Sequence, residues 1–215
     1  MPIKSAGYMH EFLASRDVDY IESFDYFTAT WIKKGQREDR LMYRHFFKQR
    51  PQKWLFNSAL ALQKRLGLSR GIPKDLAVQV GSQWWCLWHD TVEKILAFIR
   101  RRWDVKWFFK TTWIPDKTFF QTLVHHHVPT QEIKTRNVTF LIFSVYGLPV
   151  SFYNDHYDIL HSQQSLFARK ISPDATRLKS RLTALYLSPK SDFRSHKEGC
   201  ICTILPPNRV ALLSD

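Results

Sequence analysis

The sequence predicts an α/β fold in which helices cover the faces of a mixed sheet. Segments with helical periodicity alternate along the chain with short runs of β-branched and aromatic residues. The chain has 215 residues, of which 44% are hydrophobic, with only 7 glycines and 10 prolines. This composition is enough for one sizeable core and argues against a low-complexity chain.

The first third of the chain predicts three helices and one strand. A short helix should begin after Ser5, whose hydroxyl can cap it. A strand and turn should follow over 18–24, and a charged helix over 37–47. An amphipathic helix is expected over 55–66, with its apolar face formed by Leu55, Ala59, Leu62 and Leu66.

The middle of the chain predicts a buried strand over 78–87, which contains Gly81 and Ser82. A helix over 90–98 should be capped by Asp90. A short strand is expected over 107–109, and another helix should open at Pro115 and Asp116.

The last third holds the strongest strand prediction, 138–145, because this run is rich in β-branched and aromatic residues. Helices are expected over 155–166 and 175–187. The remaining residues, 188–215, form a tail with little periodicity.

The chain is strongly basic, with a net charge of +13. Such a charge favours an anionic partner: nucleic acid, an acidic membrane surface or a phosphate-bearing small molecule. A solvated basic face explains it equally well. Because no basic-helix or RNP-like signature is present, nucleic acid is not the expected partner. The densest basic run consists of Arg100, Arg101, Arg102, Lys106 and Lys110.

The cysteine pattern favours a reducing compartment. The three cysteines are an odd number without paired spacing, so we expect a cytoplasmic chain, with membrane association as a further option. No run approaches the roughly 20 apolar residues of a membrane span. The Asp17-Val18-Asp19 tripeptide is a chance-level match to a metal motif, so no metal and no other cofactor is assigned.

Three stretches resemble the core-2/I-branching β-1,6-N-acetylglucosaminyltransferase family, which also includes the peptide O-xylosyltransferases. The first is Gly81-Ser82-Gln83-Trp84-Trp85, similar to the family's Gly-Ser-x-aromatic-aromatic strand. The second is Pro115-Asp116-Lys117 with the later Gln121-Thr122-Leu123, which looks like the family's Pro-Asp-Glu stretch and Gln-Thr-Leu helix. The third is Leu166-Phe167-Ala168-Arg169-Lys170, similar to Leu-Phe-Ala-x-Lys.

The resemblance implies part of an A-type glycosyltransferase fold. It covers about residues 2–187, so 1–187 should be the C-terminal, acceptor-side part of a catalytic domain, and 188–215 a divergent tail. Family members carry a nucleotide-binding half upstream of the segment that Pro2 resembles. The resemblance therefore implies a fragment, a truncated gene product or one part of a split protein, with a separate nucleotide-binding half as a candidate partner.

The implied reaction moves N-acetylglucosamine from UDP-GlcNAc to a glycan hydroxyl in β-1,6 linkage, with inversion. Such a displacement needs a base for the hydroxyl proton and positive charge for the leaving diphosphate. Lys170 stands at the family lysine that resembles a diphosphate contact, and Arg169 can assist it. The simpler alternative for Lys170 is a solvated lysine at a helix end.

The position of the base is where the sequence departs from the family. Lys117 stands in place of the family glutamate, and an ammonium group cannot accept a proton. Asp116 is the neighbouring carboxylate, although a helix N-cap is the simplest interpretation of it. The resemblance therefore implies either an imperfect substitute base or an inactive site.

On the acceptor side, Arg37 and Arg40 match a Lys-x-x-Arg pair near the family's acceptor sugar, with a solvated helix face as the alternative. Trp84 and Trp85 offer a surface on which a sugar can stack. Alternation along a strand would turn only one of them toward a site, and core packing is the alternative for both. A catalytically inactive remnant that binds glycan or protein is the main rival to a transferase.

Overall fold

The computed structural model describes residues 1–14, 18–29 and 36–189, although the side chains of residues 36 and 37 lie outside this description. The chain divides into two compact units. Val18–Arg136 is called the inner unit, and Met1–Asp17 together with Asn137–Asp215 the terminal unit. Both units combine helices with strands, which confirms the α/β class predicted from the sequence.

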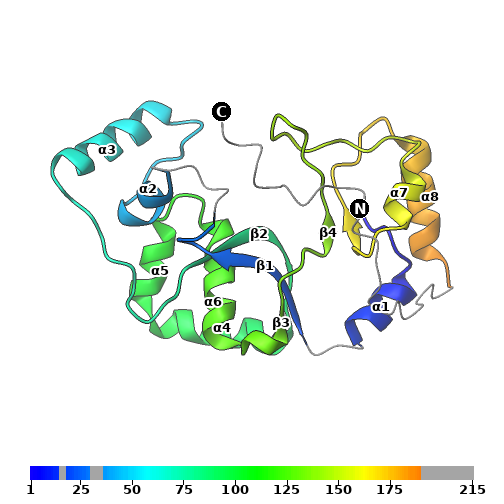
Figure 1. The fold of residues 1–215 in the computed structure, drawn as a ribbon, viewed down its shortest axis with the longest axis horizontal. Helices are drawn as coiled ribbons and strands as arrows, with labels where there is room; N and C mark the ends of the chain where they lie inside the picture. The colour runs from blue at the N-terminus through cyan, green and yellow to red at the C-terminus, as the bar shows by residue number, and fades with distance from the viewer. Residues whose placement is uncertain (15–17, 30–35, 190–215) are drawn as a thin grey trace. The chain divides into compact units, whose positions relative to one another are not determined.

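The inner unit contains most of the regular structure (Figure 1). Its strands are β1 (Asp19–Asp25), β2 (Gln79–Cys86) and β3 (Ile133–Lys134). Its helices are α2 (Gln36–Met42), α3 (Lys53–Arg65), α4 (His89–Arg101), α5 (Trp103–Lys110) and α6 (Phe119–His127), with 3-10 turns η1 (Pro115–Lys117) and η2 (Thr130–Glu132).

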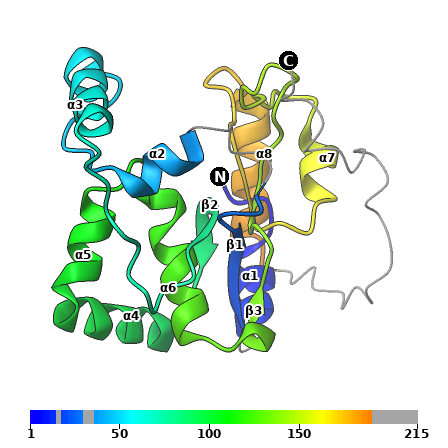
Figure 2. The same cartoon turned by 60° about the vertical axis from the view of Figure 1, so that its left-hand side comes forward.

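The sheet of the inner unit has the strand order β2-β1-β3, antiparallel between β1 and β2 and parallel between β1 and β3. Figure 2 shows α6 between this sheet and α5, with α4 below. The helices cover the sheet with their apolar faces, so that Ile21, Val80, Val105, Leu123 and Val124 are fully buried together.

The β1–β2 pair carries a bulge at the Gly-Ser-x-Trp-Trp stretch. Ile21 pairs with Trp85 and Ser23 with Gly81, so Glu22 alone faces residues 82–84. Helix α6 holds this bulge through two side chains. Gln121 Nε2 donates to the Ser82 carbonyl oxygen at 2.6 Å, and the Gln79 amide donates to Thr122 Oγ1 at 3.0 Å. The bulged strand and the Gln-Thr-Leu helix are therefore physically joined.

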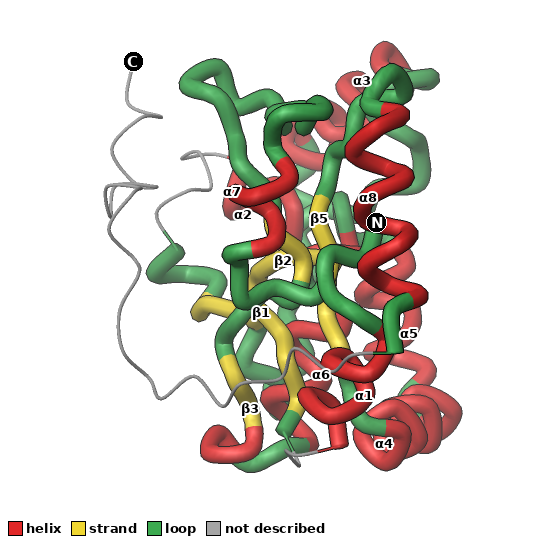
Figure 3. Tube along the Cα trace, turned by 90° about the vertical axis from the view of Figure 1, so that its right-hand side faces the viewer, coloured by secondary structure: helices red, strands yellow, loops and turns green. Residues whose placement is uncertain are grey.

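The terminal unit contains α1 (Ala6–Ala14), β4 (Thr139–Phe140), α7 (Tyr157–His161), β5 (Phe167–Ala168) and α8 (Thr176–Leu187). Figure 3 shows β5 and the helices of this unit in yellow and red. Strands β4 and β5 form a two-stranded parallel sheet. The core of the unit gathers Ile3, Phe152, Leu160, Leu178 and Leu182, each at most 1% exposed.

Several predicted elements are confirmed. Ser5 caps α1, because its Oγ accepts a hydrogen bond from the Tyr8 amide at 3.1 Å. Strands β1 and β2 and helix α8 lie where the sequence placed them. None of the helices in the described residues has the length and the apolar run needed to cross a membrane.

Two strand predictions are wrong. Residues 107–109 belong to α5, because Val105, Phe108 and Phe109 recur at helical spacing and are buried on one side. Of the predicted strand 138–145, only Thr139–Phe140 is a strand. The chain turns back beyond it: the Ser144 amide bonds to the Leu148 carbonyl oxygen at 2.8 Å, and Gly147 supplies the positive φ of 72° that the turn requires.

Two helix details also differ from expectation. Helix α3 buries Phe56, whereas Leu62 and Leu66 of its predicted apolar face are 57% and 59% exposed. Helix α4 begins at His89 and is capped not by Asp90 but by Asp19, a residue distant in sequence. The Asp19 carboxylate accepts from the Trp88 amide at 2.7 Å and from Thr91 Oγ1 at 2.6 Å.

Candidate functional site

The candidate site in the inner unit centres on Arg40 of α2. This arginine is only 9% exposed, and its guanidinium carbon lies 5.1 Å from the centre of the Trp113 ring. Its Nε and Nη1 atoms are buried and have no hydrogen-bond partner among the described residues. Burial lowers the pKa of Arg40, while Tyr26 and Asp116 act in the opposite direction. Since buried N–H groups are normally paired, these two unpaired donors make Arg40 a candidate contact for a ligand.

The turn that carries Asp116 and Lys117 is unusual in its backbone. Ile114 has φ 57° and ψ 61°, in the left-handed region that β-branched residues rarely adopt. Such a conformation costs on the order of 1–3 kcal/mol and is found at functional sites. The Trp113 amide bonds to the Arg40 carbonyl oxygen at 3.4 Å, which ties the beginning of this turn to α2.

Asp116 is not a helix cap. Helix α6 begins at Phe119, its N-cap is Thr118, and Asp116 lies in the 3-10 turn before it. The Asp116 side chain is exposed, and Lys117 is half-buried. The structural interpretation of Asp116 as an N-cap is therefore wrong. The structure brings two of the residues singled out in the sequence, Arg40 and Asp116, within electrostatic reach of one another.

An aromatic wall supports the indole beneath Arg40. The centre of the Trp113 ring lies 5.3 Å from that of Phe56 and 6.0 Å from that of His45. His45 Nε2 lies 2.7 Å from the Asp39 carbonyl oxygen, which can only accept, so Nε2 carries a proton. Burial lowers the pKa of His45, which keeps the imidazole neutral. The sequence alone did not indicate Trp113 as a residue of a functional site, although Trp113 immediately precedes the Ile114-Pro115 turn.

A second buried arginine, Arg70, differs from Arg40 in that its guanidinium donors have hydrogen-bond partners. Its guanidinium donates to the carbonyl oxygens of Leu41 at 2.6 Å and Phe108 at 2.8 Å, and to the hydroxyls of Thr111 and Thr112. Burial lowers its pKa to about 10. Arg70 therefore fixes the end of α2 to the end of α5. Its donors are used within the protein, whereas Nε and Nη1 of Arg40 have no partner among the described residues.

A cavity of about 270 Å³ lies beside this scaffold. Arg40 and Trp113 do not line it. Its wall is almost entirely apolar, so it offers little to a sugar. The lining residues are Phe27, Glu38, Leu41, Met42, Arg70, Gly71 and Ile72.

The two tryptophans of β2 have different environments. The centre of the Trp85 ring lies 4.4 Å from that of Phe120, and Trp85 packs against the core of the inner unit. Trp84 is half-buried at the end of the bulge. Because the bulge interrupts the strand, simple alternation does not apply to this stretch. Trp84 is the one of this pair that stays a candidate for contact with a sugar.

Lys170 and Arg169 belong to the terminal unit and follow β5 directly. Their backbone is paired: the Arg169 amide donates to the Phe140 carbonyl oxygen at 3.0 Å, and the Phe152 amide to that of Lys170 at 2.7 Å. The Lys170 side chain is exposed, and Arg169 is half-buried. Lys170 therefore does not lie at a helix end, which corrects that part of the simpler alternative, whereas its exposure agrees with a solvated lysine. It extends from a backbone that is fixed on both sides.

Three other features of the sequence fall outside this site. The Arg37 side chain and residues 15–17, including Asp17, lie outside the described residues, as does the predicted tail from 190 onward. Asp19, the other carboxylate of the Asp-x-Asp tripeptide, is 2% exposed and serves as the cap of α4. Its carboxylate is thus used within the protein.

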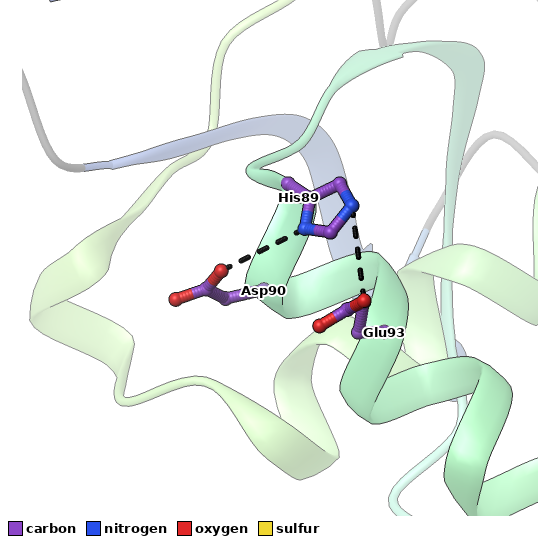
Figure 4. Close-up of side chains that lie close together, drawn as sticks. All are labelled: His89, Asp90 and Glu93. Atoms are coloured by element: carbon purple, nitrogen blue, oxygen red, sulfur yellow. Dashed lines mark ion pairs between the residues drawn. The ribbon is translucent and has the colours of Figure 1, made fainter.

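One group of side chains with the chemistry of metal ligands lies at the start of α4 (Figure 4). His89 Nδ1 lies 3.8 Å from Asp90 Oδ1, and His89 Nε2 lies 3.8 Å from Glu93 Oε1. All three side chains are exposed. The positive end of the helix dipole opposes a cation there, and no described residue supplies a further ligand. We assign no metal to this group.

Comparison with known proteins assigns the chain to a family. A family model described as Core-2/I-Branching enzyme matches residues 1–189, most of the 215-residue chain. A search of curated proteins finds no match. The matched region contains Arg40, the 115–117 turn, the bulged strand and Lys170.

Proposed function

Because the chain belongs to the core-2/I-branching enzyme family, we propose that it transfers N-acetylglucosamine from UDP-GlcNAc to a glycan hydroxyl. The family supports glycosyl transfer, with a nucleotide sugar and a glycan acceptor as its partners. The donor, the β-1,6 linkage and the inversion of the anomeric centre are parts of the proposal.

The observation that carries the proposal is the environment of Arg40. Nε and Nη1 of the buried Arg40 guanidinium have no hydrogen-bond partner among the described residues, and the guanidinium lies over the ring of the half-buried Trp113. A sugar hydroxyl that reached these atoms would pair donors that the protein itself leaves unpaired. Hydroxyl oxygens can accept from the free donors, and the C–H face of a pyranose can stack on an aromatic ring. We therefore place the acceptor sugar at Arg40 and Trp113, with Trp84 as a further contact.

The transfer step requires a base beside the acceptor. The acceptor hydroxyl attacks the anomeric carbon, the new C–O bond forms, the bond to the diphosphate breaks, and the hydroxyl proton moves to a carboxylate. Lys117 cannot take that proton in its charged form. Asp116 is exposed and acts electrostatically on Arg40, which makes it the candidate base in this proposal. We propose that it is an imperfect base and that transfer is slow.

The leaving diphosphate requires positive charge, which Lys170 and Arg169 would supply. Charge-assisted hydrogen bonds from lysine and arginine suit a diphosphate. Under this proposal the two residues neutralise the leaving group without a metal ion. An exposed lysine on a fixed backbone is compatible with such a role.

A second candidate function is glycan binding without transfer. Lys117 favours it, because the family's proton acceptor is missing while the acceptor-binding features around Arg40 do not depend on a base. The same site would then bind a glycan and leave it unchanged.

Two assays run side by side distinguish these functions. The full chain is incubated with labelled UDP-GlcNAc and a panel of oligosaccharides, and its binding to immobilised glycans is measured in parallel. We expect glycan binding together with slow transfer, and a β-1,6 linkage in the product. Binding without any transfer would favour the second candidate. The absence of both would contradict the proposed site.

A further inference from the structure

Helix α5 carries a surface that the proposed transfer reaction does not use. Trp103, Lys106, Trp107 and Lys110 recur at i, i+3, i+4 and i+7, so they form one stripe along the helix. Trp103 is 75% exposed and Trp107 44%, and both lysines are exposed. The opposite face of α5 is anchored in the core of the inner unit by Val105, Phe108 and Phe109. The stripe therefore belongs to a fixed helix and points outward.

The stripe lies in the densest basic run of the sequence. Arg100 and Arg101 are exposed at the end of α4, next to α5. Neither these arginines nor Lys106 and Lys110 form an ion pair with a described residue. The acidic groups of this region are already occupied: Arg102 binds Asp75 at 2.6 Å and Asp104 at 2.8 Å. Lys106, Lys110 and the two indoles thus share one face of α5, and Arg100 and Arg101 add positive charge at the end of the preceding helix.

We propose that this stripe docks the inner unit on an anionic lipid bilayer. Indole rings are enriched at the level of lipid headgroups, and lysine stems can lie along apolar surface while their ammonium groups reach the phosphates. A helix with aromatic and cationic residues on one face binds in the plane of such an interface. Each Lys or Arg near an anionic surface strengthens binding by roughly fivefold, so Lys106 and Lys110 should each contribute about that factor.

The shape and chemistry of the stripe favour a lipid surface over other anionic or sugar ligands. The two indoles stand one turn apart on the outer face of a helix, and the cavity described above is lined by other residues, among them Leu41 and Ile72. Single-stranded nucleic acid is usually bound in a groove that tracks its backbone. A sugar would need hydrogen-bonding carboxylates or amides beside the rings, whereas Asp104, the acidic residue of α5, is engaged by Arg102.

Co-sedimentation with lipid vesicles tests the proposal. The full chain should bind vesicles of phosphatidylcholine and phosphatidylserine, bind phosphatidylcholine alone much more weakly, and dissociate as salt is raised. The double variant Lys106→Glu/Lys110→Glu should lower partitioning at least about tenfold. Trp103→Ala/Trp107→Ala should lower it by about tenfold. Brominated lipids should quench indole fluorescence in the parent chain and much less in the tryptophan variant.

Matched controls come from α3, where Lys53 and Trp54 are also exposed. Lys53→Glu and Trp54→Ala should leave vesicle binding unchanged. Because all the substituted side chains are exposed, the variants should keep the parent's circular dichroism and melting temperature. Equal losses in the α3 controls would overturn the proposal, as would equal binding to both kinds of vesicle. It would also be overturned if the stripe variants lost binding to single-stranded RNA or to glycans but kept binding to vesicles.

Discussion

Replacing Lys117 with glutamate should raise the rate of glycosyl transfer by roughly 10²–10⁴-fold, the usual contribution of a general base. Lys117 is half-buried in the 3-10 turn that follows the strained Ile114. A carboxylate there would stand at the family position from which the acceptor hydroxyl is deprotonated. Donor affinity should change far less, because the residues proposed to contact the diphosphate are Lys170 and Arg169.

The measurement is a transfer assay beside a titration with UDP-GlcNAc, with the chain alone and with a family nucleotide-binding half added. Lys117→Gln is the matched control, since it removes the positive charge without supplying a base. If Lys117→Gln raises the transfer rate as much as Lys117→Glu does, loss of the positive charge explains the increase, and the general base lies elsewhere. In the parent chain, Asp116→Asn should abolish the residual transfer if Asp116 is the substitute base.

Substituting Gly81 with alanine should destabilise the inner unit by about 3 kcal/mol or more. A β-carbon at Gly81 would overlap the carbonyl oxygen of Glu22 and lie 2.7 Å from its carbonyl carbon. Ser23 Cα would be 3.0 Å away. These are backbone atoms, which cannot rotate aside as a side chain can. The strands would have to separate at the bulge, which weakens the pairing of β1 with β2.

Chemical denaturation followed by circular dichroism measures this effect. Gly71→Ala is the control, because a β-carbon there meets nothing within 4 Å. That substitution should leave the free energy of unfolding unchanged or raise it by about 0.4–1 kcal/mol through the unfolded state. Equal stabilities for the two variants would show that the close approach of Gly81 to Glu22 is not present in solution.

Local patterns in the sequence predicted many of the elements, but not the contacts between them. The helix after Ser5 and the strand at Gly81 follow from capping and composition. The helix over 103–110 was missed because Trp107, Phe108 and Phe109 taken alone fit a strand, and only the burial of Val105 with Phe108 and Phe109 reveals the helical period.

The site was predictable only in part, for a similar reason. Motif spacing pointed to Arg40 and Asp116, yet nothing local indicates that one acts electrostatically on the other across about 75 residues. The role of Trp113 depends on Phe56 and His45, which come from a distant part of the chain. The cap of α4 by Asp19 depends on the same kind of long-range contact. Long-range partners of this kind leave no periodic signal in a single sequence.

Glycan binding by the Arg40→Met variant shows whether Arg40 binds the acceptor sugar. We expect the parent chain to bind a subset of immobilised glycans and the variant to bind them roughly 10- to 100-fold more weakly, as expected for the loss of charge-assisted hydrogen bonds. Because the variant removes a buried cation with unused donors, its free energy of unfolding should be unchanged or higher. Undiminished glycan binding by a folded Arg40→Met chain would contradict the claim.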